Sequence, residues 1–155
     1  MSTDSKWRRK PLDTVVDIIT HVMLSLILAV FFRWLTCGWT WPVLAFMSGI
    51  FIDIDHFIDY FAHYGMRFNL RDFFKSGFLV SGRCYVLFHS WELIAAMWGL
   101  SLIFMWMTPV ATGVTVHILT DYCFRHRSNP KFLSLFHRWR YGFELEKVNK
   151  RLIFR

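Results

Sequence analysis

Long apolar stretches, rather than an amphipathic period, dominate the pattern of hydrophobic and polar positions along this chain. Four of them approach the roughly 20 helical residues needed to cross the hydrocarbon layer of a membrane. They cover about residues 12–36, 41–63, 84–107 and 109–124, and the last of them is short. The pattern predicts an all-α fold, namely an integral membrane bundle of four transmembrane helices that forms a single membrane domain over residues 1–155.

Two shorter segments mix basic and aromatic residues and lie outside the apolar stretches. One covers about residues 66–76 and includes Arg67 and Phe73, and the other covers about residues 130–143 and includes Trp139. This mixture is typical of amphipathic helices that lie in the lipid headgroups of an anionic leaflet. We therefore predict an interfacial helix in each segment.

Composition and charge agree with a membrane protein. Hydrophobic residues make up 55% and aromatic residues 19% of the 155 residues, which is too much for an ordinary soluble domain. A net charge of +7 would suggest nucleic-acid binding in a soluble protein, but of the 18 Lys and Arg residues only Arg33 lies near the opposite ends of the predicted helices. The positive-inside rule then places both termini and the middle loop in the cytoplasm, and we expect no nucleic-acid partner.

The N-terminus and the cysteines exclude two simpler interpretations. A basic N-terminus before an apolar run could be a secretory signal, but Asp17 and His21 interrupt the run and no small-residue cleavage pattern follows. We therefore expect a retained membrane helix there. Cys37, Cys84 and Cys123 are odd in number and scattered, so they indicate neither a disulfide framework nor a thiolate metal site.

Acids and histidines within the apolar stretches would lie near one face of the membrane. The first and third helices would start on the cytoplasmic side and the second and fourth would end there, so all four polar groups reach one depth. Such residues are costly within a membrane, and their clustering indicates a site. Adjacent carboxylates such as Asp53 and Asp55 would also repel each other without a cation. The cluster consists of His21, Asp53, Asp55, His56, Asp59, His89, Glu92, His117 and Asp121.

The spacing and chemistry of this cluster favour a metal site. His89 and Glu92 are three residues apart, and His117 and Asp121 are four apart, so each pair would share a helical face. Imidazoles and carboxylates without thiolates suit zinc best, with manganese, iron or cobalt as alternatives. The groups outnumber the ligands of one tetrahedral ion, so either two ions bind or some groups support the ligands and supply the base.

Specific roles follow from these positions. The predicted metal ligands are His21, Asp53, Asp55, His56, His89, His117 and Asp121. For His21, a hydrogen-bonded core histidine is an equally good interpretation. Glu92 or Asp59 could act as the general base. Arg83 and Arg125 could hold a phosphate just outside the membrane, or could simply set the topology. His63, His126 and His137 are expected at the surface.

These motifs resemble those of the bacterial membrane-bound metal-dependent hydrolases, which include inner-membrane hydrolases linked to the SOS response. The matching residues are His21, the block Asp53-Ile54-Asp55-His56, the dipeptide His89-Ser90, and His117 to Asp121. Their order is that of the family. This chain departs from the family pattern at Ile52, where proline is usual, at Glu92, where an apolar residue is usual, and in lacking the histidine-arginine pair before His89-Ser90. A weaker likeness links the His-x-x-x-Asp element to zinc-dependent phospholipase C.

Three hypotheses about function follow. The first is a metal-dependent hydrolase that cleaves a lipid or lipid-linked phosphate ester at the cytoplasmic leaflet of the bacterial inner membrane through metal-activated water. A lipid amide is a rival substrate for the same chemistry. The second is a metal or proton transporter, although the outer halves of the stretches carry almost no polar groups. The third is a non-enzymatic membrane protein whose bound metal ties the helices together.

Overall fold

The computed structural model describes residues 11–70, 73, 81–126 and 129–148. Within these residues the fold is helical, apart from loops and one isolated antiparallel bridge between Arg83 and Glu144, so the all-α prediction is confirmed. The basic N-terminus lies outside the described residues, as do residues 71–72 and 74–76 of the predicted interfacial segment 66–76. In chain order the elements are α1 (Pro11–Leu35), α2 (Thr40–Phe51), η2 (Ile52–Asp55), α3 (His56–Tyr64), α5 (Trp91–Ser101), α6 (Met107–Asp121), η4 (Tyr122–His126), η5 (Pro130–Leu133), α7 (Leu135–Arg140) and α8 (Leu145–Val148).

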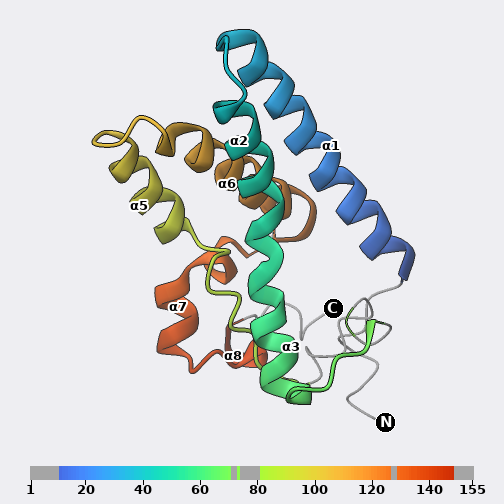
Figure 1. Cartoon of the computed structure of the whole chain (residues 1–155). Coiled ribbons are helices and arrows are strands. Elements are labelled where there is room, and N and C mark those ends of the chain that lie inside the picture. The colour runs from blue at the N-terminus through green and yellow to red at the C-terminus, as the bar shows by residue number, and fades with distance from the viewer. Residues whose placement is uncertain (1–10, 71–72, 74–80, 127–128, 149–155) are drawn as a thin grey trace.

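The longest part of the fold is an antiparallel pair. One member is α1 and the other is the continuous column formed by α2, η2 and α3, and the two are joined at one end of the molecule (Figure 1). Thr14–Leu35 and Thr40–Tyr64 are long and apolar enough to cross a membrane, by length and composition. Only 17% and 28% of their apolar windows is buried, whereas the core helix of a soluble protein would be mostly buried. Two candidate membrane-spanning helices therefore correspond to the first two predicted spans.

Small residues let α2 approach both α1 and α6 closely. A Cβ atom added at Gly49 would overlap the side chain of Ser25 on α1. One added at Gly113 on α6 would overlap the Ser48 side chain and the backbone carbonyl of Ala45. Close backbone approach through small residues is typical of helix packing in membranes. It sets α6 beside the end of α2, just before Asp53 and Asp55.

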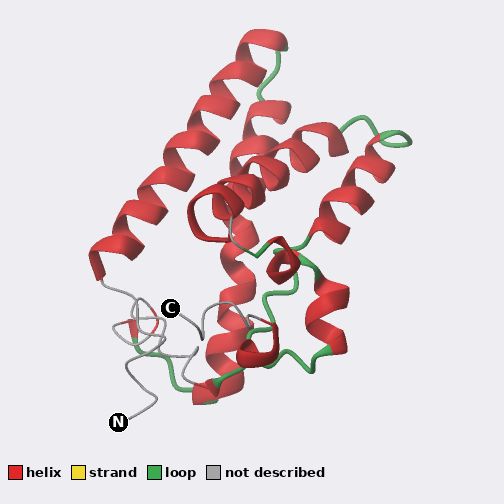
Figure 2. Cartoon of the chain, turned by 180° about the vertical axis from the view of Figure 1, so that it is seen from behind, coloured by secondary structure: helices red, strands yellow, loops and turns green. Residues whose placement is uncertain are grey.

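The third predicted span, 84–107, is wrong at its start. Residues 84–90 form a loop, so α5 has only 11 residues, and α6 has 15. At about 1.5 Å per residue, the 11 residues of α5 extend about 16 Å, short of a hydrocarbon layer of roughly 30 Å. The 15 residues of α6 extend about 22 Å and continue directly into η4, so the fourth predicted span, 109–124, is helical. The two helices form a hairpin, seen from behind in Figure 2, whose tip Leu102–Trp106 is apolar and exposed. The prediction of four full spans is therefore corrected to one long pair and one shorter pair.

The buried apolar core adjoins the acids and histidines, since Ile52 precedes Asp53 and Ile118 follows His117. Its members are Ile52, Cys84, Val86, Val114, Ile118, Phe132, Leu133, Leu145 and Val148. They come from η2, the 84–90 loop, α6, η5 and α8. The prediction of an interfacial helix over 130–143 is thus only partly right, because Phe132 and Leu133 are buried while Phe136 and Trp139 on α7 are exposed. The C-terminal segment is a packed part of the fold.

Candidate metal centre

Polar residues from four segments meet where α1, the α2–α3 junction, the 84–90 loop and α6 come together. The tighter helical turn η2 brings residues three apart onto one side. As a result, Asp53 Oδ1 lies 3.5 Å from His56 Nε2. On α6 the spacing of four residues does the same, and His117 Nε2 lies 3.6 Å from Asp121 Oδ2. The structure thus brings distant segments together, as predicted.

Among the described residues, two groups of three side chains could each hold a metal ion, with ligand atoms within 4.8 Å of one another. The buried group is His21, His117 and Asp121, and the second group is Asp53, His56 and His89. Asp53 Oδ1 lies 3.2 Å from His89 Nε2 and 3.4 Å from His117 Nε2. Asp121 Oδ2 lies 3.5 Å from His89 Nε2. The two carboxylates therefore connect the groups, an arrangement that suits two neighbouring cations or one shared cation.

Hydrogen bonds at Nδ1 fix the rings of two histidines. His117 Nδ1 donates to the carbonyl oxygen of Gly49 at 2.6 Å, and His89 Nδ1 donates to Asp55 Oδ2 at 3.0 Å. A carbonyl and an ionised carboxylate only accept hydrogen bonds, so in each neutral ring Nδ1 carries the hydrogen and Nε2 presents a lone pair. Partners of this kind hold metal-binding histidines in their ligating orientation.

The two Nε2 atoms then face each other. His89 Nε2 and His117 Nε2 lie 3.2 Å apart, with oxygens of Asp53 and Asp121 close by. Four hydrogen-bond acceptors converge, and they need extra protons or a cation between them. Imidazole nitrogens and carboxylate oxygens without thiolates are a donor set that zinc, manganese and iron accept. The residues present therefore fit a divalent cation.

His21, for which two interpretations were open, lies inside the buried group. Its Nε2 is 3.4 Å from Asp121 Oδ1 and 3.6 Å from Asp17 Oδ1, one helical turn earlier on α1. Its ring stacks on the ring of His117, with centroids 3.8 Å apart. The structure places His21 where it can act as a ligand, with Asp17 positioned to orient its ring.

Asp55 lies behind a histidine rather than among the two ligand groups. Its carboxylate is fully buried, and Oδ2 accepts hydrogen bonds from the backbone N–H of Phe88 at 2.8 Å and from His89 Nδ1 at 3.0 Å. A carboxylate bound to the far nitrogen of a ligand histidine fixes its tautomer and raises its basicity. The geometry therefore supports a positioning role for Asp55, and the ligand role expected from the sequence stays a prediction.

Asp59, one helical turn after Asp55, binds the 84–90 loop that carries His89. Its two carboxylate oxygens accept from the backbone N–H groups of Tyr85 and Val86 at 2.6 and 3.3 Å. Val86 has φ of +28°, a left-handed value that is strained for a β-branched residue. The buried Asp59 carboxylate thus helps to keep a strained turn in place.

Glu92, the other predicted base, turns toward α7. Its carboxylate accepts hydrogen bonds from Ser134 Oγ at 2.6 Å, from the Leu135 N–H at 3.0 Å and from the Phe136 N–H at 3.2 Å. Because α5 begins only at Trp91, Glu92 does not share a helical face with His89. Both carboxylates accept hydrogen bonds from backbone N–H groups, which does not favour a general-base role. That role stays a prediction for Glu92 and for Asp59.

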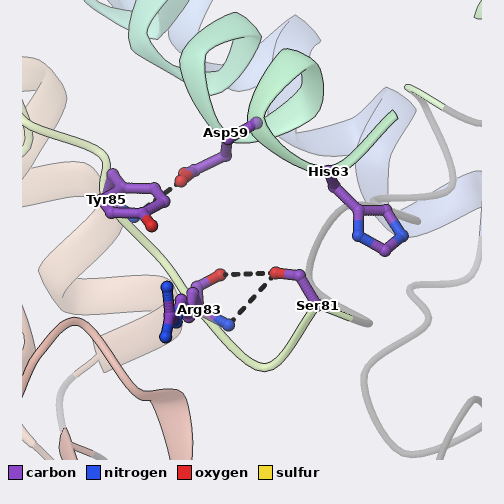
Figure 3. A pocket seen from close by; sticks show the side chains of 6 residues that line it. Asp59, His63, Ser81, Arg83 and Tyr85 are labelled. Atoms are coloured by element: carbon purple, nitrogen blue, oxygen red, sulfur yellow. Dashed lines mark hydrogen bonds between the residues drawn. The ribbon is translucent and has the colours of Figure 1, made fainter. Parts of the chain in front are cut away.

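A pocket of about 240 Å³ opens between α3 and the loop that follows it, next to Asp59. Figure 3 shows Asp59 reaching from α3 toward Tyr85, with Ser81 and Arg83 on the facing loop. The lining residues are Asp59, Ala62, His63, Ser81, Arg83 and Tyr85. Arg83, a predicted phosphate contact, therefore lines this pocket together with Asp59, which follows His56 of the second ligand group by about one helical turn. Arg125 falls in η4, and its side chain lies outside the described part of the chain.

Histidines expected at the surface stay apart from the two ligand groups. His63 is exposed at the end of α3, and His137 contacts Tyr141. Partial burial, and then the charges of Lys131 and Arg140, lower the pKa of His137, so it is neutral at neutral pH. The side chain of His126 lies outside the described part of the chain.

Sequence reasoning missed Arg138. This side chain is fully buried, and its Nη2 donates to the backbone carbonyls of Val86 at 2.9 Å and His89 at 3.0 Å. It stands in a basic segment with Lys131 and Arg140, and nothing in that pattern marks one cation as buried. The Gly49 carbonyl that holds His117 was also missed, because a backbone acceptor leaves no signal in the sequence.

Comparison with known proteins adds no further assignment. No family model, curated protein or solved structure matches this chain. The resemblance to membrane-bound metal-dependent hydrolases therefore rests on the motifs alone, and it stays a prediction.

Proposed function

We propose that this protein is a metal-dependent hydrolase, embedded in the bacterial inner membrane, that acts on a lipid or lipid-linked phosphate ester at the cytoplasmic leaflet. The observation that carries the proposal is the approach of His89 Nε2 to His117 Nε2 at 3.2 Å, with both Nδ1 atoms held by acceptors. A divalent cation would relieve the repulsion among these lone pairs and the adjacent carboxylates of Asp53 and Asp121. Zinc is the first choice, and manganese and iron accept the same donors.

The exposure of the centre favours catalysis over a purely structural ion. The side chains of Asp53 and His56 are 44% and 24% exposed, whereas those of His117 and Asp121 are 1% and 4% exposed. Structural ions are enclosed by protein ligands, while catalytic ions keep a position for water or substrate. When bound on this open side, the cation would supply a Lewis acid that activates water and offsets negative charge on the substrate.

The adjoining pocket supports a substrate that carries a phosphate. Arg83 lines it, and a guanidinium group can bind phosphate oxygens through two parallel hydrogen bonds. Ser81 and Tyr85 add hydroxyl groups that can donate to the same oxygens. These residues would bind a headgroup next to Asp59, about one helical turn along α3 from His56. A lipid amide remains the rival substrate, and the choice of lipids in the assay separates the two.

The membrane location is supported by apolar surface that the protein itself leaves uncovered. The exposed apolar side chains of α1 are Val15, Val16, Ile18, Ile19, Val22, Met23, Leu26, Ile27, Val30, Phe31, Trp34 and Leu35. A surface of this kind suits lipid chains. The acids and histidines gather at one level, near the middle of the α2–η2–α3 column, rather than along the full length of the helices, which favours a pocket over a transport path. The Lys and Arg distribution in the sequence favours a cytoplasmic location for both termini.

Metal content tests the first half of the proposal. The full-length protein is purified in detergent, and the zinc, manganese and iron bound per chain are measured by mass spectrometry. Asp53→Asn and His117→Gln should each lose bound metal because both residues lie in the two ligand groups. His63→Gln is the matched control, since His63 follows on α3 but lies outside both groups. A parent protein that binds none of the three metals would remove the proposal.

Lipid turnover tests the second half. The metal-loaded protein is incubated with phospholipids, lipid-linked phosphates and amide-linked lipids, and the release of phosphate or headgroup and of fatty acid is followed. Metal-dependent release of the phosphate-bearing product supports the proposal. Release of fatty acid from an amide would favour the amidase. Bound metal with no turnover of any lipid would favour an ion that only joins the helices.

A further inference from the structure

We infer that Arg138 is a positioning residue for His89, and that it makes the C-terminal segment an integral part of the metal centre. The inference rests on the proposed metal centre. Its own evidence is separate, because it comes from the contacts of one buried guanidinium group with the loop that carries His89.

The contacts of Arg138 close a turn. Its Nη2 donates to the Val86 carbonyl at 2.9 Å and to the His89 carbonyl at 3.0 Å. The His89 N–H also donates to the Val86 carbonyl, at 3.1 Å. One nitrogen of Arg138 therefore holds both ends of the four-residue turn that ends at His89. Rotation of that turn would move the His89 ring, because no regular helix or strand fixes the backbone there.

The opposite side of the turn is held by acids from the α2–α3 column. Asp59 accepts from the Val86 N–H, and Asp55 accepts from His89 Nδ1. Val86 itself has a strained backbone, with φ of +28°. A strained turn persists only when its surroundings fix it. Carboxylates on one side and Arg138 on the other supply that constraint.

Arg138 is a buried cation whose hydrogen-bonding groups are only partly satisfied, which is unusual for a residue with a purely structural role. Within the described residues it has no ion-pair partner, and its Nε and Nη1 atoms have no hydrogen-bond partner. Burial lowers the pKa of Arg138, but a guanidinium starts from so high a value that it stays protonated. An incompletely paired buried charge is costly. The two carbonyl contacts at the metal-binding turn give this costly arrangement a function.

The start of α7 is hydrogen-bonded to α5, the helix that follows the His89 turn. These bonds fix the distance between Arg138 and that turn. Glu92, in the first turn of α5, accepts from Ser134 Oγ and from the Leu135 and Phe136 N–H groups. Arg138, one helical turn later, donates back to the turn just before α5. The short helix α7 is thus bound at two points, and its position is transmitted to His89.

Cobalt and zinc binding test this inference on the full-length protein in detergent. Arg138→Met keeps an unbranched apolar stem but removes the donors, and Arg138→Lys keeps one cationic donor group. Arg140→Met is the control, because Arg140 is exposed on the same helix. Zinc affinity is measured by chelator competition, and the visible absorption spectrum of the cobalt form reports ligand geometry. Helicity and thermal unfolding of the metal-free variants report folding.

We expect Arg138→Met to weaken zinc binding by about 10–100-fold, the usual effect of losing a partner behind a metal ligand, and to shift the cobalt spectrum. Arg138→Lys should show a smaller change of the same kind, and Arg140→Met none. A folded Arg138→Met protein with the parent's affinity and spectrum would overturn the inference. If Arg138→Met does not fold, an unchanged spectrum in Arg138→Lys overturns it and a shifted one supports it. A parent that binds neither metal refutes the proposed centre itself.

Discussion

Replacing Asp55 with asparagine tests how the centre orients a ligand. The asparagine side chain has nearly the same shape as the aspartate, and its amide oxygen could still accept from the Phe88 N–H and from His89 Nδ1. The change removes the negative charge and leaves the fold's contacts largely in place. Asp55→Asn should therefore weaken metal binding more than it destabilises the fold.

The size of the effect follows from the 3.0 Å contact between Asp55 Oδ2 and His89 Nδ1. A hydrogen bond to a charged partner contributes about 1.5–3 kcal/mol, roughly twice a neutral one. Loss of a carboxylate behind a ligand histidine lowers metal affinity about 10–100-fold. At about 1.4 kcal/mol per factor of ten, this range equals about 1.4–2.8 kcal/mol. Because the asparagine amide oxygen still accepts, only about half of the charged hydrogen bond is lost, about 0.7–1.5 kcal/mol, so we expect an effect near the lower end of the 10–100-fold range.

Chelator competition with zinc measures the effect, and thermal unfolding of the metal-free protein checks the fold. Glu144→Gln is the matched control, because it also removes one negative charge, but from an exposed carboxylate that pairs with Lys147. Zinc affinity should fall in Asp55→Asn alone. Unchanged affinity in a folded Asp55→Asn protein would refute the reasoning that the Asp55 charge raises the basicity of His89.

Three further predictions follow from the packing and the topology. Gly113→Ala should lower the free energy of unfolding by about 1–3 kcal/mol because the added methyl group meets a backbone carbonyl of α2. Gly99→Ala is the control, since nothing lies within 4 Å of its added methyl group, and it should be neutral or stabilising. Thermal unfolding in detergent compares the two variants. Glu92→Gln should loosen α7 and lower the unfolding temperature without changing kcat, and a drop in kcat of about 100-fold or more would instead identify Glu92 as the general base. A membrane-impermeant maleimide added to intact cells should label the exposed Cys37 but not the exposed Cys123, which is expected on the cytoplasmic side, and the reverse labelling would refute the topology.

The sequence sufficed to predict most of the residues that gather, though not that Glu92 turns away, because polar groups in apolar stretches are costly and few arrangements satisfy them. His117 and Asp121 lie on one face of α6, as their spacing requires, and both reach the centre. Asp53 and His56 meet across a single turn in the same way. Local periodicity and the cost of burial carry this information, and neither depends on contacts between distant segments.

Long-range contacts explain what the sequence could not predict. Residues 84–90 are mostly apolar, so hydropathy alone favours continuing α5 backward through them. Whether they form a helix or a loop depends on acceptors from other elements, such as Asp59, 26 residues before Tyr85. The burial of Arg138 depends on carbonyls 49 and 52 residues away. A basic segment at the end of the chain predicts a surface, and only the packed fold shows which cation turns inward.

These contacts also explain why the chain carries more acids than a metal ion needs. A loop among membrane helices is possible only where its backbone groups find partners within the protein. Asp59 and Asp55 accept from backbone N–H groups of the 84–90 loop, and Arg138 donates to its carbonyls. A helix over these residues would satisfy its own backbone and require none of the three side chains. The loop lets His89 take its Nδ1 partner from the α2–α3 column and point Nε2 at α6. Asp55 and Asp59, which sequence reasoning assigned to chemistry, thus accept hydrogen bonds from the backbone that positions His89. The break in the third predicted span is therefore what brings His89 into the proposed metal centre.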